Sequence, residues 1–198
     1  MPELQEIAQL VGVCLDCPLS AARTLAVPGE GPENADLMFI GEAPGYNEDN
    51  QGRPFVGVAG QFLDELLASI GYSREQVFIT NLVKCRPPSN RDPFPGEISA
   101  CSKYLDEQIE IIRPKVIVTL GRHSLTKFMP GSIISKVHGK PCHQGRFILY
   151  PMYHPAAALH QHNLRHIVEE DFKAIPALLA ERASLEQDGP SEQQLSMF

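Results

Sequence analysis

The 198-residue chain has no apolar run that approaches the roughly 20 residues needed for a membrane-spanning helix. Its first residues, MPELQEIAQL, also lack the basic stretch followed by an apolar stretch that marks a secretory signal. Hydrophobic residues make up 43% of the chain and charged residues 21%, as in soluble globular proteins. We therefore expect a cytoplasmic protein without a membrane anchor.

Acidic residues are absent from residues 113–168, a window that holds eight lysine and arginine residues and all seven histidines. The rest of the chain has nine basic residues against 24 acidic ones, so the net charge of −7 conceals an uneven distribution. Such an asymmetry is typical of a surface that binds a polyanion. The alternative is an ordinary solvated basic face.

The glycine-rich stretch GEAPG at residues 41–45 lacks the GK[ST] ending of a phosphate-binding P-loop and the spacing of a dinucleotide fingerprint. It follows the apolar run LMFI at residues 37–40, which predicts a buried strand that ends in a tight loop. In open α/β sheets, ligands bind outside the carboxyl ends of the strands. The loop is therefore a candidate pocket wall; the alternative is a tight turn without a ligand.

Short apolar runs predict four strands, at residues 37–40, 77–80, 116–120 and 147–150. Helical periodicity predicts helices at residues 3–13, after Gly57, at residues 97–112, around residues 125–128 and at residues 164–183. Strands that alternate with helices predict a three-layer α/β/α fold with a four-stranded parallel sheet. We expect one domain over residues 1–183 with a cysteine-rich segment near its N-terminus, followed by a flexible tail over residues 184–198.

Three of the predicted strands end in chemically suggestive residues: Glu42 in the first loop, Asn81, and His154. Taken singly, Asn81 reads as a turn residue and His154, before a proline, as a loop residue. Because parallel strands bring their carboxyl ends to one edge of a sheet, we expect these side chains to converge on one site.

Disulfides are rare in cytoplasmic proteins, so the five cysteines of this chain favour metal binding or buried thiols. Cys14 and Cys17 form a CxxC pair, and Cys85 and Cys101 flank the proline-rich loop at residues 84–96. Four thiolates suit either zinc or a [4Fe–4S] cluster, and the spacing alone does not decide between them. The second CxxC pair of a zinc ribbon is missing.

Together these motifs resemble the family 4 uracil-DNA glycosylases, the iron–sulfur type of bacteria and archaea. The similarity follows the family's order over roughly residues 14–175 and rests on the four cysteines and on residues 41–45, 48–49, 52–57, 59–60, 80–81, 84–88, 90–91 and 154–156. It implies the α/β/α fold of that family and a [4Fe–4S] cluster on Cys14, Cys17, Cys85 and Cys101. It also implies a monofunctional enzyme that hydrolyses the N-glycosidic bond of uracil in DNA and leaves an abasic site for base-excision repair.

The resemblance further implies roles for the strand-end residues. Uracil would be bound by Gly41, Glu42, Ala43, Phe55, Asn81 and His154. His154 would donate a hydrogen bond to uracil O2 and stabilise the anion that forms there. Ala43 stands where better-known uracil glycosylases carry the aspartate that positions the attacking water, so we expect Glu48 to take that role and Glu42 to order the loop.

The DNA backbone would be bound by the basic residues of the proline-rich loop and of the acid-free window: Lys84, Arg86, Arg91, Lys136, His138 and Lys140. His138 stands where family members often carry arginine. The terminal residues Gln194, Leu195, Ser196, Met197 and Phe198 resemble a peptide that binds the bacterial sliding clamp; the alternative is a tail that docks on its own domain.

Two other functions stay open from the sequence. One is a non-catalytic or cross-linking protein that binds uracil or abasic sites in DNA, which His138 suggests. The other is an iron–sulfur nucleotide-binding module of the kind fused to polymerases, which the intact Asn81 and His154 disfavour. In each case we expect a monomer that works at the nucleoid.

Overall fold

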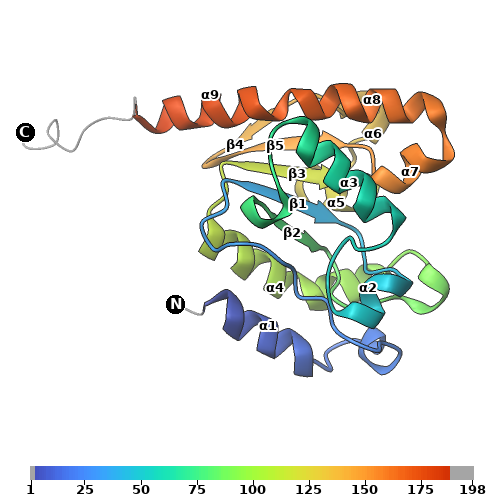
Figure 1. Cartoon of the computed structure of the whole chain (residues 1–198). Helices are drawn as coiled ribbons and strands as arrows, with labels where there is room; N and C mark the ends of the chain where they lie inside the picture. The colour runs from blue at the N-terminus through green and yellow to red at the C-terminus, as the bar shows by residue number, and fades with distance from the viewer. Residues whose placement is uncertain (1–2, 188–198) are drawn as a thin grey trace, which may run out of the picture.

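The computed structural model describes residues 3–187, apart from the side chain of His162. Its sheet has the strand order β2-β1-β3-β5-β4, with β1 (Leu37–Gly41), β2 (Phe78–Asn81), β3 (Val116–Leu120), β4 (Cys142–Gln144) and β5 (Phe147–Met152). Strands β1, β2, β3 and β5 run parallel, so their carboxyl ends share one edge (Figure 1). Within residues 3–187, no helix is long and apolar enough to cross a membrane.

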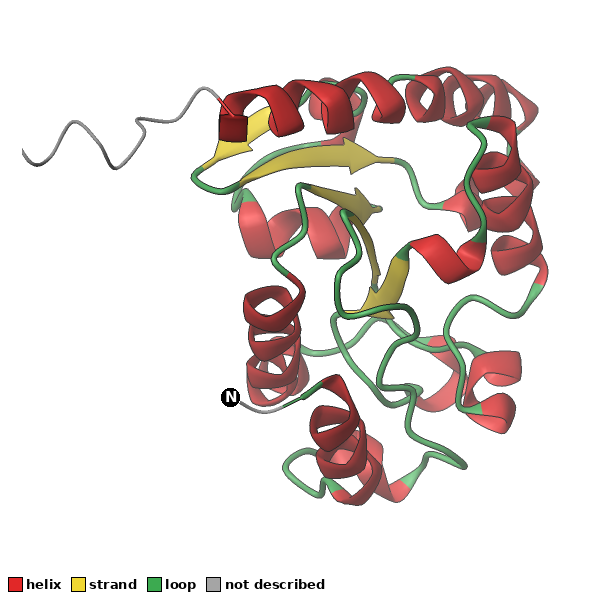
Figure 2. Ribbon diagram, turned by 60° about the vertical axis from the view of Figure 1, so that its left-hand side comes forward, coloured by secondary structure: helices red, strands yellow, loops and turns green. Residues whose placement is uncertain are grey.

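Helices cover both faces of the sheet, which Figure 2 shows twisting between them. The helices are α1 (Leu4–Val13), α2 (Tyr46–Gln51), α3 (Val58–Ser69), α4 (Pro95–Ile112), α5 (Arg122–Phe128), α6 (Ile134–Val137), α7 (Pro155–His160), α8 (His162–Lys173) and α9 (Ile175–Gln187). Helices α3, α8 and α9 pack on one face, and α4 on the other (Figure 1). Helix α1 packs against α4.

Strand β1 shows why the central strands read as unbroken apolar runs. Leu37 and Phe39 belong to the core under α3, α8 and α9, whereas Met38 and Ile40 belong to the core under α4. All four side chains are fully buried because both faces of a parallel sheet are covered. The predicted α/β/α class is thereby confirmed.

The predicted count of four strands is wrong by one. Strand β4 pairs antiparallel with β5 through a turn at Gly145, whose φ of 57° lies in the left-handed region. Its sequence, Cys142–Gln144, is short and only partly buried, so it carries no apolar run that a sequence pattern could reveal. The sheet is therefore parallel from β2 to β5, and only its edge strand β4 is antiparallel.

The single helix predicted over residues 164–183 is also wrong, because the chain forms α8 and α9 with a break at Ala174. Pro176 explains the break, since proline donates no backbone hydrogen bond and its ring clashes with the carbonyl four residues earlier. Helix α9 continues to Gln187. The domain limits at residues 183 and 184 stay a prediction, and the proposed clamp peptide at residues 194–198 lies outside the described residues.

Candidate active site

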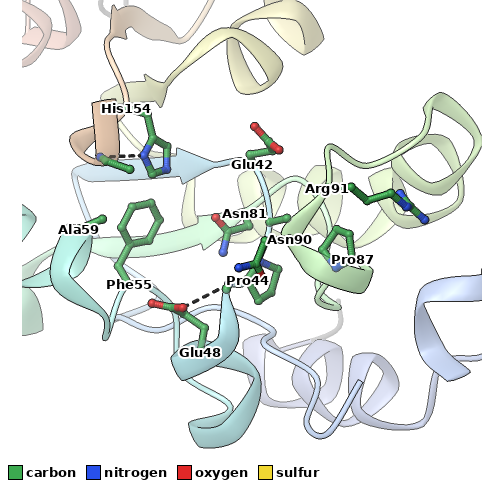
Figure 3. A pocket seen from close by; sticks show the side chains of 13 residues that line it. Glu42, Pro44, Glu48, Phe55, Ala59, Asn81, Pro87, Asn90, Arg91 and His154 are labelled. Carbon is green, nitrogen blue, oxygen red and sulfur yellow. Dashed lines mark hydrogen bonds between the residues drawn. The ribbon is translucent and has the colours of Figure 1, made fainter. Parts of the chain in front are cut away.

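A cavity of about 400 Å³ opens at the carboxyl ends of the parallel strands. Figure 3 shows Phe55, Asn81 and His154 pointing into it from three different parts of the chain. The lining residues are Glu42, Ala43, Pro44, Gly45, Glu48, Phe55, Ala59, Asn81, Pro87, Asn90, Arg91, His154 and Ala156. The expected convergence of Glu42, Asn81 and His154 is therefore what the fold produces.

Phe55 forms one wall of the cavity in a backbone conformation that phenylalanine rarely adopts. Its φ is 51°, its side chain is buried, and its ring stacks on that of His154 with centroids 5.5 Å apart. Arg74 donates hydrogen bonds to the carbonyl oxygens of Pro54 and Phe55. These bonds help hold a left-handed conformation that is otherwise unfavourable for a bulky residue.

Gly41 allows the wall and the floor of the cavity to meet. A Cβ atom at this position would lie 2.4 Å from Asn81 Oδ1 and 2.7 Å from Phe55 Cζ. Gly41 thus lies against these two side chains, and its expected contact with the base stays a prediction. Its role is to leave room for Asn81 and Phe55.

The side-chain amide of Asn81 has no hydrogen-bond partner within residues 3–187, although the residue is only 2% exposed. Its sole recorded bond uses the backbone carbonyl, which accepts from Lys84 Nζ at 2.9 Å. The amide atoms of Asn81 nevertheless keep some accessible surface, because Thr119 Oγ1 is the one side-chain nitrogen or oxygen atom within residues 3–187 that is both fully buried and without a partner. Since Asn81 borders the cavity, its donor and acceptor are available to a planar ligand there.

His154 is held as a neutral hydrogen-bond donor. Its Nδ1 accepts a hydrogen bond from the backbone N–H of Ala156 at 3.1 Å, which leaves the ring proton on Nε2. Burial lowers the pKa of His154 to about 4, and the nearby Glu48 carboxylate opposes this shift only weakly. At neutral pH the ring is therefore uncharged, with Nε2–H as its donor.

This lowered pKa predicts a stability loss in mild acid. Between pH 6.5 and pH 4 the unfolded state binds a proton at His154 that the folded state does not, so the free energy of unfolding falls as the pH falls. We expect the wild type to lose about 2 kcal/mol more than His154→Asn between pH 7 and pH 5. Urea unfolding at both pH values measures this difference, and equal losses in the two proteins would contradict it.

Glu48 is anchored by the backbone around it. Its Oε1 accepts hydrogen bonds from the N–H groups of Val56 and Gly57, both at 2.9 Å, and its Oε2 accepts one from Gly45 at 3.1 Å. The carboxylate thus ties the start of α2 to the segment that carries Phe55. Glu48 still borders the cavity, but both of its oxygens already have partners.

Glu42 is held less tightly and belongs to a charged group at the cavity rim. Its Oε2 lies 3.7 Å from His123 Nε2, which lies 3.2 Å from Asp92 Oδ2. Arg122 pairs with the same Asp92. Burial raises the pKa of Glu42, and His123 counteracts that rise. Ligand atoms of Glu42, Asp92 and His123 all lie within 4.8 Å of one another, the one such group within residues 3–187 that is spaced for a single metal ion.

The four predicted cluster cysteines border a second, apolar cavity between α1 and α4. Cys85 and Cys101 are buried, and Arg23 Nη1 donates to Cys85 Sγ at 3.1 Å and to the Val11 carbonyl at 3.3 Å. Four cysteine side chains around one apolar cavity form a donor set that fits a metal centre.

Lys84 does not face DNA, and that expectation is wrong. Its side chain is 1% exposed, and Nζ donates to Thr80 Oγ1 at 2.5 Å, Gln108 Oε1 at 2.8 Å and the carbonyl of Asn81. Buried ammonium groups are tolerated only when their donors find acceptors. Lys84 thus fastens the start of the proline-rich loop to β2 and α4.

Arg91 lines the cavity and Arg86 is bonded to the lining residue Asn90, but the guanidinium groups of both already have partners. Arg86 Nε donates to Asn90 Oδ1 at 2.7 Å. Arg91 forms a bidentate pair with the buried Glu97, at 2.7 and 2.9 Å. That pairing lowers the pKa of Glu97. Both side chains are therefore fixed in place beside the cavity.

The acid-free window is less basic in space than in sequence. Five of its eight cations, Lys115, Arg122, Lys127, Arg146 and Arg165, form ion pairs with acids from outside the window. His138 pairs with Asp171 at 2.8 Å and its side chain is only 25% exposed, so it fastens the α6 region to α8. Lys136 and Lys140 are exposed and without an ion pair among the described residues, so they are the available cations of the predicted set.

Several residues of the site were assigned no role from the sequence. Asn90 and Pro87 line the cavity because Ser89 and Asn90 both have positive φ angles, near 54°, which turn the proline-rich loop toward it. Arg74, which holds Phe55, comes from an unremarkable polar stretch. Asn90 alone carried a signal, as a residue that tolerates positive φ in a turn.

Comparisons with known proteins identify the family of this chain. A family model described as the uracil DNA glycosylase superfamily matches residues 28–176. A type-4 uracil-DNA glycosylase of Sulfurisphaera tokodaii is 55% identical over 189 residues, which cover 90% of this chain and 86% of the relative. Type-4 enzymes of Saccharolobus solfataricus and Archaeoglobus fulgidus are 51% and 45% identical; each alignment covers 92% of this chain, and 89% and 96% of the relatives. The resemblance drawn from the sequence motifs is confirmed.

Proposed function

The chain belongs to the uracil-DNA glycosylase superfamily, among its type-4 enzymes, and from that premise we infer that it removes uracil from DNA. It hydrolyses the N-glycosidic bond of a flipped-out deoxyuridine and leaves an abasic site for base-excision repair in the cytoplasm. The observation that best supports this is the convergence of Phe55, Asn81 and His154 on one cavity at the strand ends.

Release of free uracil from a uracil-containing oligonucleotide, followed by alkaline cleavage at the abasic site, tests this function. We expect release without strand cleavage before the alkali step, because no lysine nucleophile lines the cavity within residues 3–187. A stable protein–DNA adduct without released uracil would favour the alternative, a cross-linking protein. The Asp171 partner of His138 gives no support to that alternative, since it fixes this histidine to α8.

We propose that Phe55 stacks on the uracil ring and that Asn81 reads its Watson–Crick edge. The free amide of Asn81 supplies one donor and one acceptor, which match the O4 and N3–H of uracil. Cytosine presents a donor in place of O4, so its amino group would face the donor of Asn81. A site built on such bonds rejects the wrong base strongly because buried polar groups stay unpaired.

His154 would act on the departing base. As the bond to the sugar breaks, negative charge grows on uracil, and the Nε2–H of His154 would donate to O2 as it does so. A neutral imidazole suits this task, because it stabilises the anion through a hydrogen bond without first gaining a proton. The backbone N–H of Ala156 keeps the ring in the required tautomer.

The attacking water requires a carboxylate, and the contacts favour Glu42 over Glu48 for it. Both oxygens of Glu48 accept backbone hydrogen bonds, so its main task is to hold the Phe55 segment. Glu42 lines the cavity, and its carboxylate accepts no hydrogen bond within residues 3–187. This division reverses the roles expected from the sequence, and we propose it on the basis of these contacts.

A pair of variants separates the two carboxylates. Glu42→Gln should lower the single-turnover rate of excision by about tenfold to 100-fold, because an amide orients water but cannot accept its proton. Glu48→Gln should instead lower the free energy of unfolding by about 1–3 kcal/mol, because its NH₂ group would face a backbone donor. A slow but fully stable Glu48→Gln, beside a Glu42→Gln of wild-type rate, would restore the first assignment.

We propose that Cys14, Cys17, Cys85 and Cys101 hold a [4Fe–4S] cluster. When bound, such a cluster cross-links the turn after α1 and the proline-rich loop to α4 through four thiolate bonds. The position of all four cysteines around one apolar cavity supports it. Iron and sulfide analysis together with the visible absorption spectrum tests the assignment directly.

We also propose that residues 194–198 recruit a sliding clamp, with the chain that follows α9 as a tether. Deletion of residues 194–198 should abolish binding to the clamp and leave uracil release from a free oligonucleotide unchanged. Surface plasmon resonance on immobilised clamp measures the first effect, and an excision assay without clamp measures the second. Unchanged clamp binding would remove this proposal.

A further inference from the structure

Two exposed aromatic side chains lie beside the cavity and have no part in the function described so far. Tyr46 is 62% exposed and begins α2, directly after the lining residue Gly45. Phe94 is 58% exposed and stands at the start of α4, at the far end of the proline-rich loop. Aromatic rings beside a positively charged groove are the usual stacking platforms for single-stranded nucleic acid.

Both rings are positioned by arginines of the proline-rich loop. The guanidinium of Arg86 lies over the ring of Tyr46, with its carbon 5.1 Å from the centroid. The guanidinium of Arg91 lies over Phe94 at 3.8 Å. Since Arg86 is bonded to Asn90, and Arg91 to the buried Glu97, each cation is fixed from behind. The rings are thereby held in place before any ligand binds.

The two arginines that contact the rings also connect them to the cavity. Asn90, which accepts from Arg86, lines the cavity, and Arg91 lines it as well. We name Tyr46, Arg86, Arg91 and Phe94 the aromatic rim. Arg91 lines the cavity, and the other three adjoin residues that line it: Tyr46 follows Gly45, Arg86 is bonded to Asn90, and Phe94 packs against Arg91. A strand that places one nucleotide in the cavity must carry its neighbours across the border of the cavity.

We propose that the aromatic rim stacks the unpaired bases next to the flipped uridine and thereby favours single-stranded DNA. The proposal rests on the proposed function, because it needs a uridine in the cavity. Stacking on aromatic rings is available to every base, and Arg86, whose hydrogen-bond partner Asn90 is neutral, supplies a positive charge for the phosphates. In a duplex the flanking bases stay paired and stacked on their neighbours. They therefore have no free face that could stack on the aromatic rim.

The test compares flanking bases with no flanking bases. One single-stranded 15-mer carries a central deoxyuridine between ordinary nucleotides, and a second carries abasic tetrahydrofuran residues on both sides of the deoxyuridine. Removal of the flanking bases should raise about tenfold the oligonucleotide concentration at which the wild type is half-saturated. This factor lies within the range of base–aromatic stacking. The double variant Tyr46→Leu/Phe94→Leu should bind the first oligonucleotide with an affinity reduced by a similar factor. Its affinity for the second oligonucleotide should equal that of the wild type.

Fluorescence gives a readout that does not depend on catalysis. 2-Aminopurine is placed beside a tetrahydrofuran abasic site, on its 5′ side in one strand and its 3′ side in another. Stacking on a protein ring should quench its emission when the wild type binds, and the double variant should quench neither strand. Tyr46→Phe retains a ring and should behave as the wild type.

Leu10→Ala serves as the matched control, because Leu10 is an exposed apolar side chain on α1 and does not line the cavity. Equal affinity of the wild type for the two 15-mers, or equal quenching by the double variant, would overturn the proposal. Absence of uracil release from every substrate would instead overturn the proposed function. The two failures are thus distinct.

Discussion

Replacing His154 by asparagine is expected to lower the single-turnover rate of uracil excision by about 10²- to 10³-fold, the usual effect of removing one donor to a developing anion. Asparagine is a good helix N-cap and retains an acceptor for the N–H of Ala156. Its side chain is too short to replace Nε2–H in the cavity. The substitution therefore removes the donor while keeping the start of α7.

His160→Asn is the matched control, since His160 is exposed at the end of the same short helix and does not line the cavity. Its rate should stay within twofold of the wild type. Rapid-quench assays with enzyme in excess measure the chemical step, and binding to abasic product should change little in either variant. A rate of His154→Asn above one tenth of the wild type would mean that the donor lies elsewhere.

Replacing Cys17 by serine is expected to abolish the visible absorption of the cluster and to lower the melting temperature by at least about 10 °C. Metal binding at a structural site contributes directly to folding free energy, and each kcal/mol shifts the midpoint by about 2–4 °C in a chain of this size. Cys17 is the suitable position because it lies in the turn after α1, where the loss of one sulfur hardly disturbs core packing.

Cys142→Ser provides the control for that experiment. Cys142 lies in β4, outside the cavity that the other four cysteines border, and is partly exposed. Its replacement should change neither the absorption nor the melting temperature appreciably. If both serine variants keep the absorption, Cys17 is not a ligand; if zinc replaces iron in the elemental analysis, the cluster assignment is wrong and the four-cysteine site stands.

The architecture was predictable where one pattern governed it. The apolar runs of β1, β3 and β5 identify buried strands because both faces of the sheet are covered, and parallel pairing then brings Glu42, Asn81 and His154 together. Strand β4 was not predictable, since three half-buried residues carry no periodicity. The break before α9 depends on a single proline within an otherwise helical pattern.

Side-chain roles were harder to predict because they depend on contacts distant in sequence. Lys84 lies among basic loop residues, yet its acceptor Gln108 comes from α4, and only the packed structure reveals the burial. Glu48 and Glu42 are both acids in one loop, and their difference arises from backbone donors at Val56 and Gly57. No sequence pattern predicts the positive φ of Phe55.

That backbone conformation has a kinetic consequence. The strain at Phe55 is overcome once, when the chain folds and Arg74 and Glu48 fasten the segment on either side. A pocket built in advance needs no loop closure after a base arrives. The rate at which uracil is captured is then governed by how often the nucleotide leaves the DNA stack. The pocket does not rearrange when the base enters.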